Sequence, residues 1–228
     1  MLTSVVVPNH NRDLSRLKAS LPFHVEFIEI NLGFERSRQR NIGIKQAKGD
    51  IIIWLDSDQA LSPGLVEECE HLMSMGYISL YIPEVIVAKS FFGKIRAFER
   101  EFYIGTFIDV PRAVLRKFCP LFNENLHGPE DADFGNRIPA QFRGVTKSVL
   151  YHYDDIRFME YCKKKYYYTK SMKLYEKLNP NDKCLDIKYR CWDVFVEKGK
   201  WKKLLRHPIL TVGVMFLLGV RGIIYSQR

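Results

Sequence analysis

The chain has 228 residues, 46% of them apolar and 27% charged, so it can bury a sizeable core and is not a disordered protein. Its five cysteines are odd in number and include no Cys-x-x-Cys pair, which argues against a zinc ribbon or a disulfide framework and favours a reducing, cytoplasmic compartment. The net charge of +9 comes from the last third, because residues 1–150 hold 18 basic and 18 acidic side chains, whereas residues 151–228 hold 17 and 8. A basic segment favours an anionic partner, although a Lys-rich solvated helical surface is the alternative.

The first half of the chain alternates short apolar strands with helices. Strands are predicted at 3–8, 24–32, 51–55 and 77–83, and helices at 13–21, at 33–49 and from Ser62-Pro63 onward. This order predicts an α/β fold in which helices flank a mostly parallel sheet. Ligands bind beyond the carboxyl ends of strands in such sheets, so residues 8–12 and 56–58 should lie on one edge.

The second half of the chain mixes shorter elements and then becomes helical. Residues 91–118 predict a helix, a short strand at 106–110 and a short helix from Pro111. Residues 127–138 predict a loop that enters a helix, and residues 144–155 predict a strand. Strand signals end at Asp155, so residues 156–228 are expected to form a helical, basic extension.

Two carboxylates follow the predicted strand 51–55 directly, at Asp56 and Asp58. Like charges so close together repel each other, and a hard divalent cation would relieve the repulsion. Mg²⁺ and Mn²⁺ prefer carboxylate oxygens and keep water or phosphate in their remaining positions. The alternative is a solvated turn in which one aspartate caps a helix.

Several short motifs occur in an order that resembles the family 2 glycosyltransferases, which have the GT-A (Rossmann-like) fold. The matching segments are a first strand with a Pro-x-x-Asn turn, an Arg-Asn-x-Gly helix start, an Ala-x-Gly turn, an Asp-x-Asp strand end and a Glu-Asp pair. The matching residues are Pro8 and Asn11; Arg40, Asn41 and Gly43; Ala47 and Gly49; Asp56 and Asp58; and Glu130 and Asp131. The resemblance covers residues 3–155 and implies a catalytic domain over 1–155, with a donor half at 1–83 and an acceptor half at 84–155.

The resemblance implies transfer of a sugar from a nucleoside-diphosphate sugar to an acceptor hydroxyl, with inversion. Asp58 and Asp56 would hold Mn²⁺ or Mg²⁺ and the diphosphate, and His152 is a further metal ligand by the same resemblance. Asp131 would be the base, and Glu130 would orient it.

Pro8, Asn11 and Arg40 are assigned to the donor side by the same motifs. The alternatives are helix-start acids at 130–131, a packed or surface His152 and an exposed helix arginine at position 40. After the second strand the family usually carries an acidic loop rich in Ser and Asp, where this chain has INLGFERS. The nucleotide of the donor therefore stays open.

The C-terminal segment joins a basic start to an apolar run from 208 to 220. These thirteen residues are fewer than the roughly 20 that a spanning helix needs, and an extension to Tyr225 includes Arg221. Residues 200–228 therefore predict an interfacial helix, peripheral on the inner face of the cell membrane, that lysines and Trp201 anchor. The alternative is a terminal core helix. Nucleic acid is not an expected partner, since no recognition motif accompanies the Lys-Tyr segment 163–177.

A membrane location would suit an acceptor that is a lipid-linked or membrane-proximal glycan. Three other functions stay open. A sugar-nucleotide pyrophosphorylase would need a Gly-rich loop after the first strand, where the chain has PNHNRDL. A metal-dependent nuclease could use the same carboxylates, and an inactive GT-A-like domain could only bind membranes.

Overall fold

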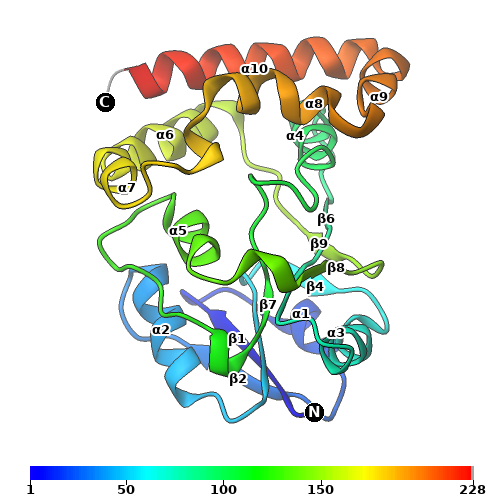
Figure 1. Ribbon diagram of the computed structural model, residues 1–228, viewed down its shortest axis with the longest axis vertical. Helices are drawn as coiled ribbons and strands as arrows, with labels where there is room; N and C mark the ends of the chain where they lie inside the picture. Colours follow the sequence, from blue (N-terminus) through cyan, green and yellow to red (C-terminus); the bar gives the residue numbers. More distant parts are fainter. Residues whose placement is uncertain (227–228) are drawn as a thin grey trace.

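A six-stranded sheet forms one end of the molecule, in the order β2-β1-β3-β7-β5-β8 (Figure 1). The structure is a computed structural model that describes residues 1–226. The strands of this sheet are β1 (Thr3–Pro8), β2 (Glu26–Ile30), β3 (Ile51–Trp54), β5 (Ser79–Tyr81), β7 (Ala113–Leu115) and β8 (Arg143–Val145). A smaller sheet, in the order β4-β9-β6, consists of β4 (Gln59–Leu61), β6 (Glu84–Ile86) and β9 (Leu150–His152).

Helices cover the sheet and form a separate layer beyond it (Figure 1). Those of the first half are α1 (Ser15–Ala19), α2 (Arg36–Gln46), α3 (Leu65–Ser74), α4 (Phe91–Arg100) and α5 (Glu130–Asn136). Those of the second half are α6 (Phe158–Thr169), α7 (Met172–Leu178), α8 (Val194–Val196), α9 (Trp201–Arg206) and α10 (Pro208–Ser226). A π-helical segment, Tyr189–Asp193, precedes α8, and short 3₁₀ turns occur at 116–118, 140–142, 183–185 and 197–199. In Figure 1, α4 and α6–α10 lie on the far side of α5 from the six-stranded sheet.

The α/β fold with a central sheet flanked by helices is confirmed. Strand β1 runs parallel to β2 and β3, and β5 runs parallel to β8, but β7 is antiparallel to β3 and β5. The predicted strand at 106–110 is wrong, because this segment forms turns in which the buried Asp109 accepts hydrogen bonds from the Gly105 and Val110 amides. The helix predicted from Pro111 is also wrong, since the chain enters β7 there, between two buried strands.

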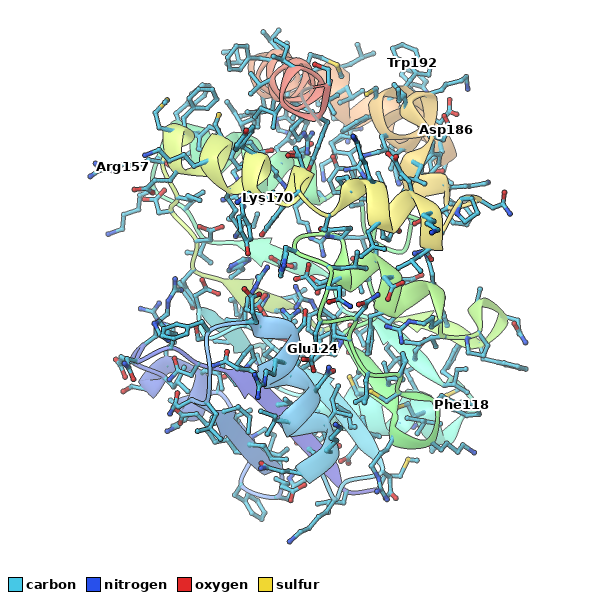
Figure 2. The ribbon with its side chains drawn as sticks, turned by 90° about the vertical axis from the view of Figure 1, so that its left-hand side faces the viewer. Phe118, Glu124, Arg157, Lys170, Asp186 and Trp192 are labelled. Atoms are coloured by element: carbon cyan, nitrogen blue, oxygen red, sulfur yellow. The ribbon has the colours of Figure 1, made fainter. Side chains whose placement is uncertain are left out.

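Two glycines of the Ala-x-Gly and Arg-Asn-x-Gly motifs let α2 and the turn after it pack closely on β1. A Cβ atom at Gly43 would lie 2.3 Å from Val6 Cγ1, and one at Gly49 would lie 2.7 Å from the Ser4 amide nitrogen. The motif residue Asn41 is also structural, because its side chain donates to the Phe122 carbonyl and accepts from the Phe122 amide. Glu124, beside α2 in Figure 2, accepts a further hydrogen bond from Asn41. These contacts fix the position of α2, on which Arg40 lies.

The buried apolar side chains form two clusters. The first fills the space around the six-stranded sheet and includes the whole of β3, with every side chain from Ile51 to Leu55 inaccessible. The second joins α4 to the C-terminal helices, and its buried members are Ile95, Phe98, Phe102, Tyr103, Tyr161, Tyr189, Val194, Phe195, Val214 and Leu217. The C-terminal helices therefore share a core with α4. The division of the chain at residue 155 stays a prediction.

Helix α10 is continuous over 19 residues and is, by length and composition, the one helix of the described chain that could cross a membrane. It extends past Arg221, which is buried and forms an ion pair with Glu99 of α4. Ile209 and Val212 are 71% and 70% exposed, and Phe216 is 59% exposed although one edge of its ring contacts Phe158. The charge that seemed to end the apolar run thus lies on the inner side of the helix, so the outer side stays apolar.

Candidate active site

Asp56 lies at the carboxyl end of β3 and is neutralised by two arginines. Its Oδ1 is 2.7 Å from Arg40 Nη2, and its Oδ2 is 3.4 Å from Arg112 Nη1. The Asp56 amide donates to Gln59 Oε1, which holds the turn that follows the strand. Burial alone would raise the pKa of Asp56, but Arg40 and Arg112 outweigh it and hold that pKa well below its usual value. Asp56 is therefore ionised.

Asp58 has a separate set of partners. Its Oδ1 is 3.2 Å from His152 Nε2, and its Oδ2 is 2.8 Å from Arg12 Nη1. Burial opposes ionisation, yet His152 and Arg12 lower the pKa of Asp58. The repulsion between Asp56 and Asp58, which was the reason to expect a metal ion, is thus relieved by cations of the protein itself.

His152 lies between two carboxylates. Its Nε2 faces Asp58, and its Nδ1 is hydrogen-bonded to Glu84. Burial would lower the pKa of His152, but Asp58 and Glu84 raise it to about 10. Glu84 is in turn held by Arg100 at 3.3 Å and Arg112 at 3.5 Å, so the imidazole has a fixed orientation.

Asp58 and His152 carry donor atoms suited to part of a divalent cation's ligand shell, but the cation would first have to displace the proton that His152 holds between Asp58 and Glu84. Their facing atoms are 3.2 Å apart, and Glu84 stands behind the imidazole as carboxylates do behind metal-binding histidines. Within residues 1–226 no cluster of three or more potential ligands is present, so a diphosphate and water would have to complete the shell. Asp56 is less suited to direct ligation, because Arg40 and Arg112 already occupy its two oxygens.

Arg40 is the most buried charged side chain of the site, with no accessible surface. Its guanidinium lies 2.7 Å from both Asp56 and Asp131 and 4.5 Å from the ring centroid of Trp54. Burial and Arg36 oppose its charge, but the surrounding acids raise the pKa of Arg40 further. In this conformation Arg40 offers a ligand no surface. It is not the exposed helix arginine that the sequence left as an alternative, and it joins the end of β3 to the start of α5.

The acidic pair at the start of α5 divides into a buried and an accessible member. Glu130 is 2% exposed and accepts hydrogen bonds from Arg36 at 3.1 Å and from the Gly128 amide. Burial and Asp131 raise the pKa of Glu130, against the opposing charges of Arg36 and Arg40. The Asp131 side chain is 27% exposed and lines a cavity. Of the two, Asp131 alone has access to a ligand there.

This cavity, of about 770 Å³, lies between the start of α5 and the helical layer. Its walls come mainly from α4, α5, α6, α7, α10 and the segment 184–191. Glu84 and Arg112, which contact His152 and Asp56, also line it. The cavity is therefore adjacent to the acidic residues at the end of β3.

The turn after β1 lies beside Asp58, as the strand order predicted. Pro8 is buried at the end of β1, and Asn11 is exposed in the left-handed region at a φ of 54°, which asparagine tolerates. Asn9 stabilises the turn by accepting a hydrogen bond from the Arg12 amide and donating one to Glu29. This geometry brings Arg12 to Asp58, while no contact of Pro8 or Asn11 assigns them to a donor.

Sequence reasoning missed Arg12, Glu84 and Arg112. Arg112 could have been found as a charged residue directly before the apolar run Ala113–Leu115. Glu84 could have been found as an acidic residue directly after the predicted strand 77–83, which ends at Pro83. Both charges are buried at strand ends, where an unpaired charge would be costly, so each implies a partner.

Comparison with known proteins gives a family match and a similar fold. Residues 10–112 match the sequence model of Glycosyl transferase family 2. The crystal structure of S. aureus TarS 1-349 is similar, with 13% identity, a TM-score of 0.52 and coverage of 94% of this chain and 79% of that chain. The same TarS fragment in complex with UDP-GlcNAc gives 13% identity, a TM-score of 0.57 and coverage of 96% and 80%. No curated protein matches the chain. Residues 10–112 are thus similar to glycosyl transferase family 2, and the fold is similar to that of TarS, which supports a GT-A arrangement.

Proposed function

We propose that the protein is an inverting glycosyltransferase that moves a sugar from a nucleoside-diphosphate sugar to an acceptor hydroxyl. The observation that carries this proposal is the buried bridge from Asp56 through Arg40 to Asp131. It holds an acidic site at the end of β3 and a cavity-lining carboxylate on α5 in a fixed relation. A single displacement needs such a pair of sites, one for the leaving group and one for the attacking hydroxyl.

On the donor side, Asp58 and His152 are the residues that would hold Mn²⁺ or Mg²⁺ with the diphosphate. The metal supplies Lewis-acid neutralisation of the charge that develops on the leaving diphosphate. Arg12, with a side chain that is 60% exposed, is placed to pair with phosphate oxygens on the same edge. The UDP-GlcNAc complex of TarS supports a nucleotide-sugar donor, and UDP and GDP are both candidates for the nucleotide.

On the acceptor side, Asp131 takes the proton of the attacking hydroxyl. Its carboxylate faces the cavity, and Arg40 fixes its orientation from the buried side. Glu130 holds the first turn of α5 through Arg36 and the Gly128 amide, so it positions Asp131 without contacting a substrate. A base held in one orientation contributes most when its distance to the hydroxyl is set in advance.

The acceptor is proposed to be a lipid-linked or membrane-proximal glycan, because the outer side of α10 suits the inner face of a cell membrane. Ile209, Val212 and Phe216 form an exposed apolar stripe at helical spacing. Trp192, 60% exposed, lies at the same end of the molecule as α10 (Figure 2), and α9 adds exposed basic residues. Since the inner side of α10 packs on α4 and α6, the helix is proposed to lie in the membrane plane.

Release of UDP or GDP from a panel of nucleotide sugars with Mn²⁺ tests the proposed reaction. Asp131→Asn should lower turnover about 100-fold or more, since it removes the base. The matched control is Asp50→Asn, at the opposite end of β3, which should keep full turnover. Intact turnover in Asp131→Asn would refute the base assignment. Cleavage of labelled DNA would favour a nuclease, nucleoside triphosphate formed from added pyrophosphate would favour a pyrophosphorylase, and no binding of any nucleotide sugar would favour an inactive domain.

Sedimentation with anionic vesicles tests the proposed membrane contact. The double variant Ile209→Asn, Val212→Asn removes two apolar side chains that are 71% and 70% exposed on the outer side of α10, and it should reduce the bound fraction several-fold. Phe23→Ser is the control, because Phe23 is a fully exposed phenylalanine in the loop between α1 and β2. Equal loss in the control, or no loss in the double variant, would contradict a role for α10.

A further inference from the structure

The cavity beside Asp131 has more positive than negative side chains on its walls. Six cationic side chains line it, against three carboxylates. Four of the cations have an acidic partner within 4 Å: Arg96 pairs with Asp154, Arg100 with Asp109, Arg112 with Asp56, and Arg221 with Glu99. In the described part of the chain, Lys165 and Arg190 have none.

Lys165 extends from α6 toward the cavity between two tyrosines. Its Nζ lies 5.4 Å from the ring centroids of both Tyr161 and Tyr168. Burial, Arg221 and Arg190 together lower the pKa of Lys165 to about 7. A cation in this position is destabilised by its surroundings, so an anion bound beside it would be stabilised.

Arg190 reaches the same cavity from a distorted helix. It lies in the π-helical segment Tyr189–Asp193, a geometry that occurs in short pieces and often at functional sites. Its Nη1 donates a hydrogen bond 3.1 Å long to the Cys184 carbonyl, which holds the guanidinium at the cavity wall. A guanidinium has five N–H donors in a planar fork, so most of them stay available to an anion.

We propose that Lys165 and Arg190 form a subsite for a phosphate group of the acceptor, in the cavity where Asp131 meets the acceptor hydroxyl. This inference rests on the proposed transfer reaction for the role of the ligand, but the subsite itself rests on Lys165 and Arg190, which have no acidic partner within 4 Å among residues 1–226. The donor diphosphate is assigned elsewhere, at Asp58 and His152. Lysine and arginine without carboxylate partners are the side chains that bind phosphate esters.

The apolar part of the cavity wall suggests what carries the phosphate. Leu218 and Gly222 of α10 line the cavity together with Ile108 and Val110. The wall is thus partly apolar, with a contribution from the proposed membrane helix, and partly cationic. An acceptor with a phosphate joined to a lipid chain matches both kinds of lining, whereas a soluble phosphorylated glycan matches the cationic residues alone.

Calorimetric titration of the full chain, without donor or metal, tests the subsite. The probes are geranyl phosphate, geraniol and inorganic phosphate. Geranyl phosphate should bind, and Lys165→Met and Arg190→Met should each weaken binding about tenfold or more, since each removes a charged hydrogen-bond donor. Lys165→Arg should keep most of the affinity, and Lys164→Met, an exposed lysine on the same helix, should keep all of it.

The three probes separate the two sources of phosphate. Tighter binding of geranyl phosphate than of inorganic phosphate identifies a lipid phosphate, and equal binding, lost in the same variants, identifies a soluble phosphate. Absence of binding by either phosphate, or unchanged binding in both Met variants, would overturn the subsite. If the subsite proposal is wrong, release of UDP or GDP from nucleotide sugars is unaffected. If the proposed transferase reaction is wrong, binding of geranyl phosphate is unaffected, so the two proposals fail independently.

Discussion

Arg40 Nη1 lies 2.7 Å from Asp131 Oδ1, although 91 residues separate them in the chain. The other terminal nitrogen of the same guanidinium lies 2.7 Å from Asp56 Oδ1. One fully buried side chain therefore connects the motif at the end of β3 with the motif at the start of α5. The two motifs act at a fixed separation because they share this cation.

Replacement of Arg40 should destabilise the fold. Arg40→Met leaves Asp56 and Asp131 without their shared partner in a partly buried position, and loss of one member of a buried ion pair costs about 3 kcal/mol. Urea unfolding monitored by tryptophan fluorescence measures the change. Arg38→Met, on the exposed side of the same helix, should be within about 0.5 kcal/mol of the parent protein. Equal effects of the two substitutions would show that the Arg40 bridge does not stabilise the fold.

The glycine at position 43 should tolerate no side chain. Gly43→Ala places a methyl group against Val6 and should lower the free energy of unfolding by about 1–3 kcal/mol through overpacking. Gly219→Ala is the matched control, since no atom lies within 4 Å of the added Cβ and the helix gains up to about 1 kcal/mol. Thermal unfolding of both variants checks the opposite signs. A stable Gly43→Ala protein would mean that α2 can move away from β1.

The sequence alone predicted the fully buried strands and the position of the residues that directly follow them. The apolar runs of β1 and β3 have no other plausible place than the centre of a sheet, and their carboxyl ends place residues 8–12 beside residues 56–58. The family motifs added Glu130 and Asp131.

The partners of the acidic residues could not be predicted, because they come from distant segments. Arg112 lies directly before β7, which pairs antiparallel with β3, and this pairing brings Arg112 to Asp56. A strand of three residues is too short for its hydrophobic pattern to predict such a pairing. Arg221 was expected to interrupt an apolar helix, but helical geometry turns it toward Glu99 and leaves the outer side apolar. Periodicity alone does not show which side of a terminal helix is covered when both sides are apolar.

The stability of the protein should depend on pH through Lys165. The pKa of Lys165 is lowered to about 7 in the folded state from 10.5, chiefly by burial. Below pH 7 the Lys165 side chain is protonated in both the folded and the unfolded state, so the full cost of burying the charge lowers the free energy of unfolding. Between pH 7 and about 10 the folded state has lost this proton and the unfolded state still holds it, so the free energy of unfolding rises with pH. Lys165→Met should therefore be more stable than the parent at pH 6, and its advantage should shrink by pH 9. Urea unfolding at both pH values measures this, with Lys164→Met as control; an advantage that grows with pH would contradict the lowered pKa.

The ion pair between Arg221 and Glu99 should hold α10 against α4. Arg221→Met leaves Glu99 buried with only the Tyr103 hydroxyl as donor and should cost about 3 kcal/mol. The double variant Glu99→Gln, Arg221→Met should recover part of that loss, since no charge is then left unpaired. Chemical unfolding of the three variants supplies the cycle. A double variant as unstable as the sum of the single changes would show that the two side chains do not interact.

The central claim is that Asp58, with His152, binds the diphosphate of a nucleotide donor through a divalent cation. Calorimetric titration of UDP and GDP, with and without Mn²⁺, tests it in the parent protein, in Asp58→Asn and in the control Asp50→Asn. We predict that one nucleotide binds the parent and the control only when Mn²⁺ is present, and that Asp58→Asn abolishes this binding. Nucleotide binding of equal strength in Asp58→Asn, or no binding of either nucleotide to the parent protein, would contradict the account.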